Sequence, residues 1–354
     1  MYIERNGPPK MSYGSISIMP ETLTPISEND ELSIGQIILL LSQEHEEEEV
    51  VDLTRKYCLQ SSSNEIQKKG MEFLYMNGFF DDLRILITKN QLSNHPSNQL
   101  WAEVYQIILD RRDRKYSVGE MRTRLQEMIP TDPELKCLIE LVIVDTYFNQ
   151  MDFGQFGNFL EKQQELFEPI QDNFILSSFN LRTYQKLFIY YWTRNELIMA
   201  RKYAFRALNQ TNSPTTKVSL HMNLALTYSF DTYYQGMYHL KEALKIAEKF
   251  NLNKFIHSIK DKSIPFFAAH FGRPNGVESS DISEQAHLEI AKGNNEKAIE
   301  LLEDIYTESP FKMYYMGLAK KDKNLLSESC RMFVERSDYF FSRLPMNAIK
   351  NLGL

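Results

Sequence analysis

The chain has 354 residues, of which 43% are hydrophobic and 25% charged, and it carries a net charge of −7. This composition is typical of a globular protein rather than a disordered one, and the acidic balance disfavours a protein that coats nucleic acid along its whole surface. We expect no membrane span and no signal peptide, because the longest apolar runs, at 37–41 and 141–144, are too short to cross a bilayer. The three distant cysteines, Cys58, Cys137 and Cys330, predict neither a disulfide framework nor a zinc site, and favour a reducing, cytosolic compartment.

The N-terminal stretch carries a DNA-reading signature. Residues 12–19, SYGSISIM, resemble the recognition helix of Cro/repressor-like helix-turn-helix domains, and residues 24–41 resemble the loop and scaffold helix that follow it. Such a helix presents small polar side chains to base edges. About ten preceding residues leave no room for the earlier helices, so we expect a partial helix-turn-helix at 1–45, or alternatively a short cap on the helical array. The candidate DNA contacts are Ser12, Tyr13 and Ser15.

From Leu53 onward the chain repeats one pattern, in which a helix ends at a short polar turn and a second helix follows. In the stretch 200–250, small residues recur at helical spacing, Pro214 opens a second run, and a third run follows Thr232. Most successive turns lie roughly 30 to 45 residues apart, which is near the period of tetratricopeptide repeats. The pattern therefore predicts an all-α, right-handed superhelical solenoid of tetratricopeptide-like hairpins over 46–354.

The clearest hairpin is expected at 283–305, where a Gly-Asn turn at 293–294 separates two amphipathic runs. A solenoid of such pairs leaves a concave groove, and we expect extended or helical peptides to bind in this groove.

We find no sequence motif of an enzyme and expect no cofactor or metal. The chain contains no HExxH, Walker loop, GxSxG elbow or CxxC pair. His221, His239 and His287 each lie inside an amphipathic stretch, where a hydrogen-bonded core or groove histidine is the simpler interpretation.

Several motifs occur in a familiar order. RKYCL at 55–59, RTYQ at 182–185, SEQAH at 283–287 and ERSDYFFSRLP at 335–345 together resemble the arbitrium receptors, AimR, of Bacillus temperate phages. The resemblance implies a DNA-binding head joined to a tetratricopeptide-like solenoid that binds a short secreted phage peptide. It also implies a quorum-sensing switch, in which the free receptor activates a lysis-promoting locus and the peptide favours lysogeny.

The resemblance also suggests peptide-binding positions. Asp338 falls where the family has an acidic pocket residue, and Phe341 where it has an apolar one. Thr215 and Leu226 occupy positions where the family uses an arginine and an asparagine, so a different peptide is expected. Asn223, one helical turn before Leu226, would supply the missing amide. The alternative for Asp338 is a helix-terminal or loop carboxylate that makes a surface ion pair.

The leading hypothesis is a cytosolic, peptide-responsive transcription regulator of phage lysis and lysogeny, without enzymatic activity. Its expected partners are a short signalling peptide, DNA, and a second copy in a homodimer that is weakened by the short C-terminal segment after Pro345. The alternative is a Rap-like adaptor solenoid that binds a protein partner and no DNA.

Overall fold

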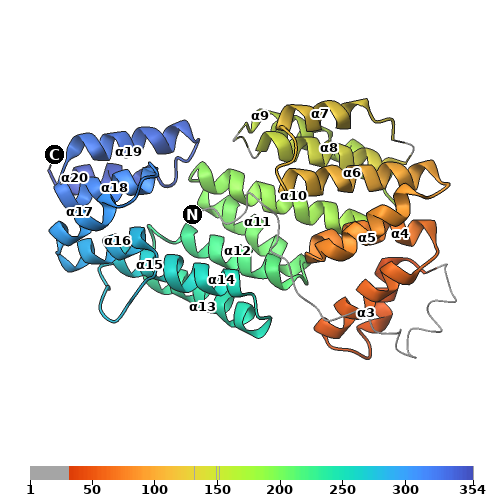
Figure 1. The fold of residues 1–354 in the computed structure, drawn as a ribbon, viewed down its shortest axis with the longest axis horizontal. Helices are drawn as coiled ribbons and strands as arrows, with labels where there is room; N and C mark the ends of the chain where they lie inside the picture. The colour runs from red at the N-terminus through yellow and green to blue at the C-terminus, as the bar shows by residue number, and fades with distance from the viewer. Residues whose placement is uncertain (1–31, 131, 149, 151, 354) are drawn as a thin grey trace. The chain divides into compact units, whose positions relative to one another are not determined.

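The computed structural model describes residues 32–353 except 131, 149 and 151. Every regular element in these residues is a helix, which confirms the all-α prediction (Figure 1). The chain divides into two compact units, one that ends at Thr183 and one that begins at Tyr184. The predicted boundary at residue 45 lies within the first unit. The predicted DNA contacts Ser12, Tyr13 and Ser15 lie outside the described residues.

The first unit is a succession of helices in which chain neighbours pack side by side. Its helices are α2 (Ile34–Leu41), α3 (Glu47–Gln60), α4 (Asn64–Asn77), α5 (Phe80–Gln91), α6 (Pro96–Arg112), α7 (Val118–Glu127), α8 (Pro133–Phe148) and α9 (Gly154–Phe167). Helix α10 (Asn173–Thr193) crosses the boundary between the units.

The second unit continues the same pattern. Its helices are α11 (Leu197–Gln210), α12 (Pro214–Thr227), α13 (Tyr233–Lys249), α14 (Asn253–Ser258), the π-helical turn η2 (Ile259–Ser263), α15 (Ile264–His270), α16 (Ile282–Lys292), α17 (Asn295–Glu303), α18 (Pro310–Lys320), α19 (Lys323–Glu335) and α20 (Arg343–Asn351).

Local sequence signals explain where these helices begin and end. Pro214 occupies the first turn of α12, where its missing N–H costs nothing, and the Ser213 side chain accepts the N–H of Thr216 at 3.4 Å. Gly293 ends α16 in the left-handed conformation, with φ of 87°. The predicted hairpin at 283–305 is therefore confirmed as α16 and α17.

Small residues let neighbouring helices of the second unit approach closely. Ala200, Ala204 and Ala207 of α11 are fully buried, as their spacing predicts. Gly236 of α13 lies against the Phe267 ring of α15, and a Cβ atom at this glycine would stand 2.1 Å from the ring's Cε1. The contact between α13 and α15 therefore requires glycine at 236.

A buried ion pair joins α4 to α10 within the first unit. The Arg182 guanidinium donates from Nε and Nη2 to the two Glu72 oxygens, at 3.0 and 2.5 Å, and the Tyr105 hydroxyl donates to the same carboxylate. Glu72 is fully buried and Arg182 is 4% exposed. Because removal of either partner leaves an uncompensated buried charge, this pair fixes α10 against α4.

Candidate functional site

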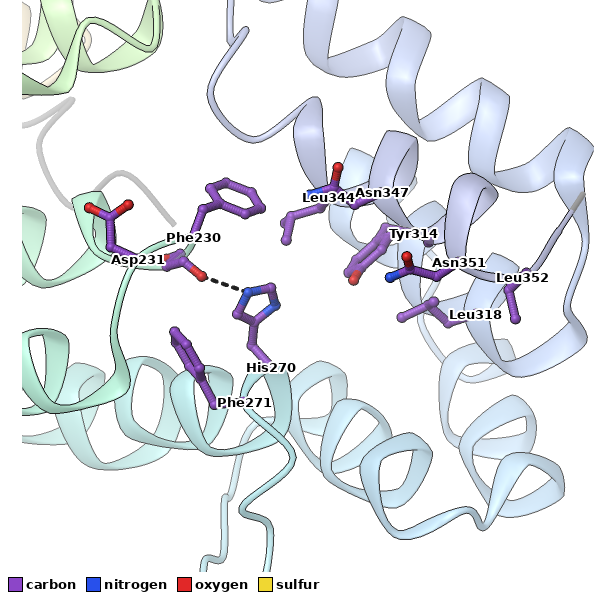
Figure 2. Close-up of a pocket in the computed structure, with 12 residues that line it drawn as sticks. Phe230, Asp231, His270, Phe271, Tyr314, Leu318, Leu344, Asn347, Asn351 and Leu352 are labelled. Atoms are coloured by element: carbon purple, nitrogen blue, oxygen red, sulfur yellow. Dashed lines mark hydrogen bonds between the residues drawn. The ribbon is translucent and has the colours of Figure 1, made fainter.

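A cavity of about 420 Å³ opens in the second unit (Figure 2). It is formed by four segments: the turn after α12, the C-terminal end of α15, one face of α18, and α20. Its wall combines aromatic and aliphatic side chains with polar ones. Its lining consists of Ser229, Phe230, Asp231, His270, Phe271, Tyr314, Leu318, Leu344, Asn347, Ala348, Asn351 and Leu352.

Aromatic rings support this wall from behind. The rings of Phe230 and Phe340 meet edge to face with centroids 5.0 Å apart, and Phe340 meets Phe341 in the same way at 5.0 Å. Phe341 in turn contacts Phe311 at 5.2 Å and Trp192 at 5.8 Å. Edge-to-face pairs of this kind stabilise a core beyond the area that they bury. The cavity wall is therefore held in a defined shape.

The ionisable groups in the lining are neutralised. Asp231 is ion-paired with Arg201, whose guanidinium also donates to the Thr227 carbonyl at 2.7 Å. His270 Nε2 lies 2.7 Å from the Ser229 carbonyl oxygen, which can only accept, so Nε2 carries the proton. Burial, and secondarily the charge of His287, lower the pKa of His270 to about 4, so this ring is neutral at pH 7.

One face of α12 carries two polar side chains. Ser219, Asn223 and Leu226 are spaced by four and three residues, so they share this face. Ser219 Oγ and Asn223 Oδ1 are both buried and have no hydrogen-bond partner among the described residues. A buried polar atom without a partner is costly, so this face of α12 carries two unsatisfied groups.

The structure places Thr215, Asn223 and Leu226 together on buried α12, but none of the five predicted peptide-binding residues lines the cavity. Thr215 Oγ1 lies 3.0 Å from Ser213 Oγ. The sequence reasoning missed Ser219, although its position one turn before Asn223 was a usable signal. Contact of the five predicted residues with a peptide stays a prediction.

Asp338 and Phe341 lie in the turn between α19 and α20. Asp338 Oδ1 accepts the N–H of Phe341 at 3.0 Å, and Asp338 is 2% exposed. The N–H of Phe340 donates to the Thr193 carbonyl at 3.1 Å, which ties this turn to the end of α10. Asp338 thus orders the segment that leads into α20, one wall of the cavity.

A second group of ionisable side chains is buried between α16 and α18. The Tyr315 hydroxyl donates to the Glu284 carboxyl at 3.2 Å, and the His287 ring stacks on Tyr315 with centroids 4.2 Å apart. His287 Nδ1 lies 3.5 Å from Glu284 Oε2. Burial, and secondarily the charge of Asp281, raise the pKa of Glu284 to about 8, whereas burial lowers the pKa of His287 to about 3. Both groups are therefore mainly uncharged at pH 7.

The other two histidines are hydrogen-bonded, as the core-or-groove interpretation predicts. His221 Nδ1 and His239 Nδ1 lie 3.0 Å apart, so one ring donates to the other between α12 and α13. Within the described residues, no three His, Cys, Asp or Glu side chains gather in a way that would hold a metal ion. No described helix combines the length and the apolarity that a membrane span needs.

Successive helices that pack as hairpins, with a cavity among those of the second unit, define a helical-repeat protein. The model of the AimR transcriptional regulator-like family matches residues 50–351, and the chain belongs to this family. The resemblance expected from the sequence motifs is thus confirmed.

Two curated relatives are similar over most of the chain. The AimR transcriptional regulator of Bacillus phage SPbeta is 22% identical over 315 residues, which are 85% of this chain and 81% of the relative. The AimR transcriptional regulator of Bacillus phage phi3T is 23% identical over 274 residues, which are 74% of this chain and 71% of the relative. The solved structure of phAimR-Ligand has the same fold, with a TM-score of 0.74, 19% identity, and coverage of 91% of this chain and 98% of that one.

Proposed function

We propose that this protein is a peptide-responsive transcription regulator of phage lysis and lysogeny, and that it binds a short signalling peptide in its second unit. The observation that carries the proposal is the pair of buried, unpartnered atoms Ser219 Oγ and Asn223 Oδ1 on one face of α12, in the unit that also holds the cavity. An extended peptide has free backbone N–H and C=O groups, which are the partners that these two atoms lack. Family membership supports the regulatory role.

The binding mode follows from the chemistry of this face. Asn223 Oδ1 accepts a peptide N–H, and Ser219 Oγ accepts or donates to the next peptide group. Phe341 and Asp338 act from behind the cavity wall, and Thr215 and Leu226 shape the α12 side. A peptide that binds one arrangement of the helices more tightly than another shifts the population toward it, which is the thermodynamic requirement for a switch.

The DNA-binding part of the proposal rests on residues 1–45, with Ser12, Tyr13 and Ser15 as base contacts and 46–354 as the peptide-binding solenoid. We propose that the regulator acts in the host cytosol as a homodimer, without enzymatic activity. Family membership favours this role over the Rap-like adaptor.

Titration calorimetry tests the proposal. The purified protein is titrated with synthetic peptides that correspond to the C-terminal ends of the small open reading frame just downstream of its gene. We expect one peptide to bind with a micromolar or lower Kd, and Asn223→Ala to weaken that binding. Absence of binding to every peptide by a folded protein would refute the peptide-receptor function. A gel-shift assay on promoter DNA, with and without the bound peptide, tests the regulatory half separately.

A further inference from the structure

The cavity between the α12–α13 turn, α15, α18 and α20 has the size of a pocket for one part of a small ligand. Its volume of about 420 Å³ lies at the lower end of the roughly 300 to 1,000 Å³ typical of small-molecule sites. A folded protein partner needs a much larger surface, because stable protein interfaces bury about 800 Å² on each side. The volume therefore fits one or two side chains of a short peptide.

The wall selects against positive charge. Its aromatic and aliphatic members, among them Phe230, Tyr314 and Leu318, offer no counter-ion. Its one carboxylate, Asp231, is already paired with Arg201. The nearby Arg343 guanidinium stacks on the Phe230 ring at 4.1 Å and donates to the Asn195 side chain at 2.8 Å, which adds a further positive charge beside the wall. A positively charged side chain in the cavity would lose water without gaining a partner, which is costly.

Helix α20 adds polar groups of a single kind. Asn347 and Asn351 stand four residues apart on one face of α20, and both line the cavity (Figure 2). Each amide offers both a donor and an acceptor, which matches the N–H and C=O of a peptide unit. Ala348, between them in sequence, leaves room for a guest beside the helix.

We infer that this cavity is the specificity pocket of the receptor: it takes an uncharged, aromatic or large aliphatic side chain of the peptide, while Asn347 and Asn351 hydrogen-bond the main chain that flanks it. This inference rests on the proposed peptide-receptor function and adds residues of α20 to its site. According to this inference, the receptor selects its peptide by the side chain at one position and not by the charge of the whole peptide.

Two capped amino acids serve as probes on the full chain. Ligand-observed NMR compares N-acetyl-L-phenylalaninamide with N-acetyl-L-lysinamide. We expect the phenylalanine probe to bind with a Kd of about 1 mM, as its size allows, and the lysine probe to bind at least about tenfold more weakly. Equal binding of the two probes would overturn the inference.

Variants of α20 test whether the phenylalanine probe binds in the cavity. Ala348→Phe fills the space and should abolish binding, and the double variant Asn347→Ala with Asn351→Ala should weaken it about tenfold. Met346→Ala, on the same helix but outside the lining and 44% exposed, is the matched control and should bind as the wild type does. Circular dichroism checks that each variant is folded, and the exposed asparagine pair keeps the test decisive if Ala348→Phe fails to fold. Unchanged binding by a folded Ala348→Phe protein or by the asparagine variant would overturn the inference.

The same variants separate the two proposals. If a peptide binds the wild type, Ala348→Phe and the asparagine variant equally well, the receptor function stands and the pocket is wrong. If the phenylalanine probe binds the cavity but no peptide binds the protein, the cavity's preference for uncharged side chains stands and the receptor function is refuted.

Discussion

The buried carboxyl of Glu284 should make the stability of this protein fall as the pH rises above neutral. Burial raises the pKa of Glu284 from 4.5 to about 8 in the folded protein. Between these two values the folded state holds a proton that the unfolded state has released, so unfolding becomes easier as the pH increases. The stabilising contribution of the protonated carboxyl is complete below pH 4.5 and is lost as the pH rises through about 8.

The expected magnitude is clearest as a difference between the wild type and Glu284→Gln. Glutamine keeps an oxygen that accepts the Tyr315 hydroxyl but does not ionise. From pH 6.5 to the folded-state pKa of about 8, the span is 1.5 units. At about 1.4 kcal/mol per unit, the variant should gain about 2 kcal/mol relative to the wild type over this range. The lowered pKa values of His239, His270 and His287 contribute equally to both proteins and cancel in the difference.

Urea unfolding at half-unit pH steps from 6.5 to 9 measures this difference. The charged groups that act on the carboxyl, Asp281 and Lys262, are present in both proteins. Glu289→Gln, on the same helix, is the control, because hydrogen bonds from the Asn294 and Lys292 side chains lower the pKa of Glu289 and its titration lies below this range. Its offset from the wild type should be constant. A constant offset for Glu284→Gln as well would show that the folded protein ionises Glu284 normally, and would refute the reasoning.

Three further substitutions test other parts of the structure. Asn223→Ala removes an unpaired buried oxygen, so the melting temperature should stay unchanged or rise. The same variant should weaken peptide binding about tenfold in calorimetry. A lower melting temperature with unchanged affinity would contradict this prediction. Glu72→Gln should destabilise the protein by about 3 to 5 kcal/mol in urea, because Arg182 keeps its charge without a counter-ion, and a loss below about 1 kcal/mol would contradict it. Gly236→Ala should cost about 1 to 3 kcal/mol, because its methyl group collides with Phe267, and an unchanged urea midpoint would show that the helices separate freely.

The helices themselves could be predicted from local sequence because their signals are local. Small residues at three- and four-residue spacing in 200–250 marked the faces that pack closely, and Ala200 and Ala204 are indeed fully buried. The Ser213-Pro214 pair and Gly293 marked a helix start and a helix end for reasons of backbone chemistry.

The cavity could not be predicted in this way, because its lining comes from segments between Ser229 and Leu352 that are far apart in sequence. Hydrophobic periodicity shows that a side chain is buried, but not which distant ring it meets. Phe340 and Trp192, for example, pack at 5.9 Å although about 150 residues separate them. Asn347 and Asn351 gave no signal in the sequence, since exposed asparagines on a helix are ordinary.

The resemblance to a family identified Asp338 and Phe341, and their geometry suggests why both would matter to a switch. Asp338 holds the N–H of Phe341, and the Phe341 ring contacts rings on α15 and α18 as well as Trp192 on α10. Helix α20, which follows directly, is one wall of the cavity. Under the proposed function, a peptide that displaced α20 would also displace the 338–341 turn, because packed rings repack rather than stretch. The ring contacts of this turn join α20 to α10, α15 and α18.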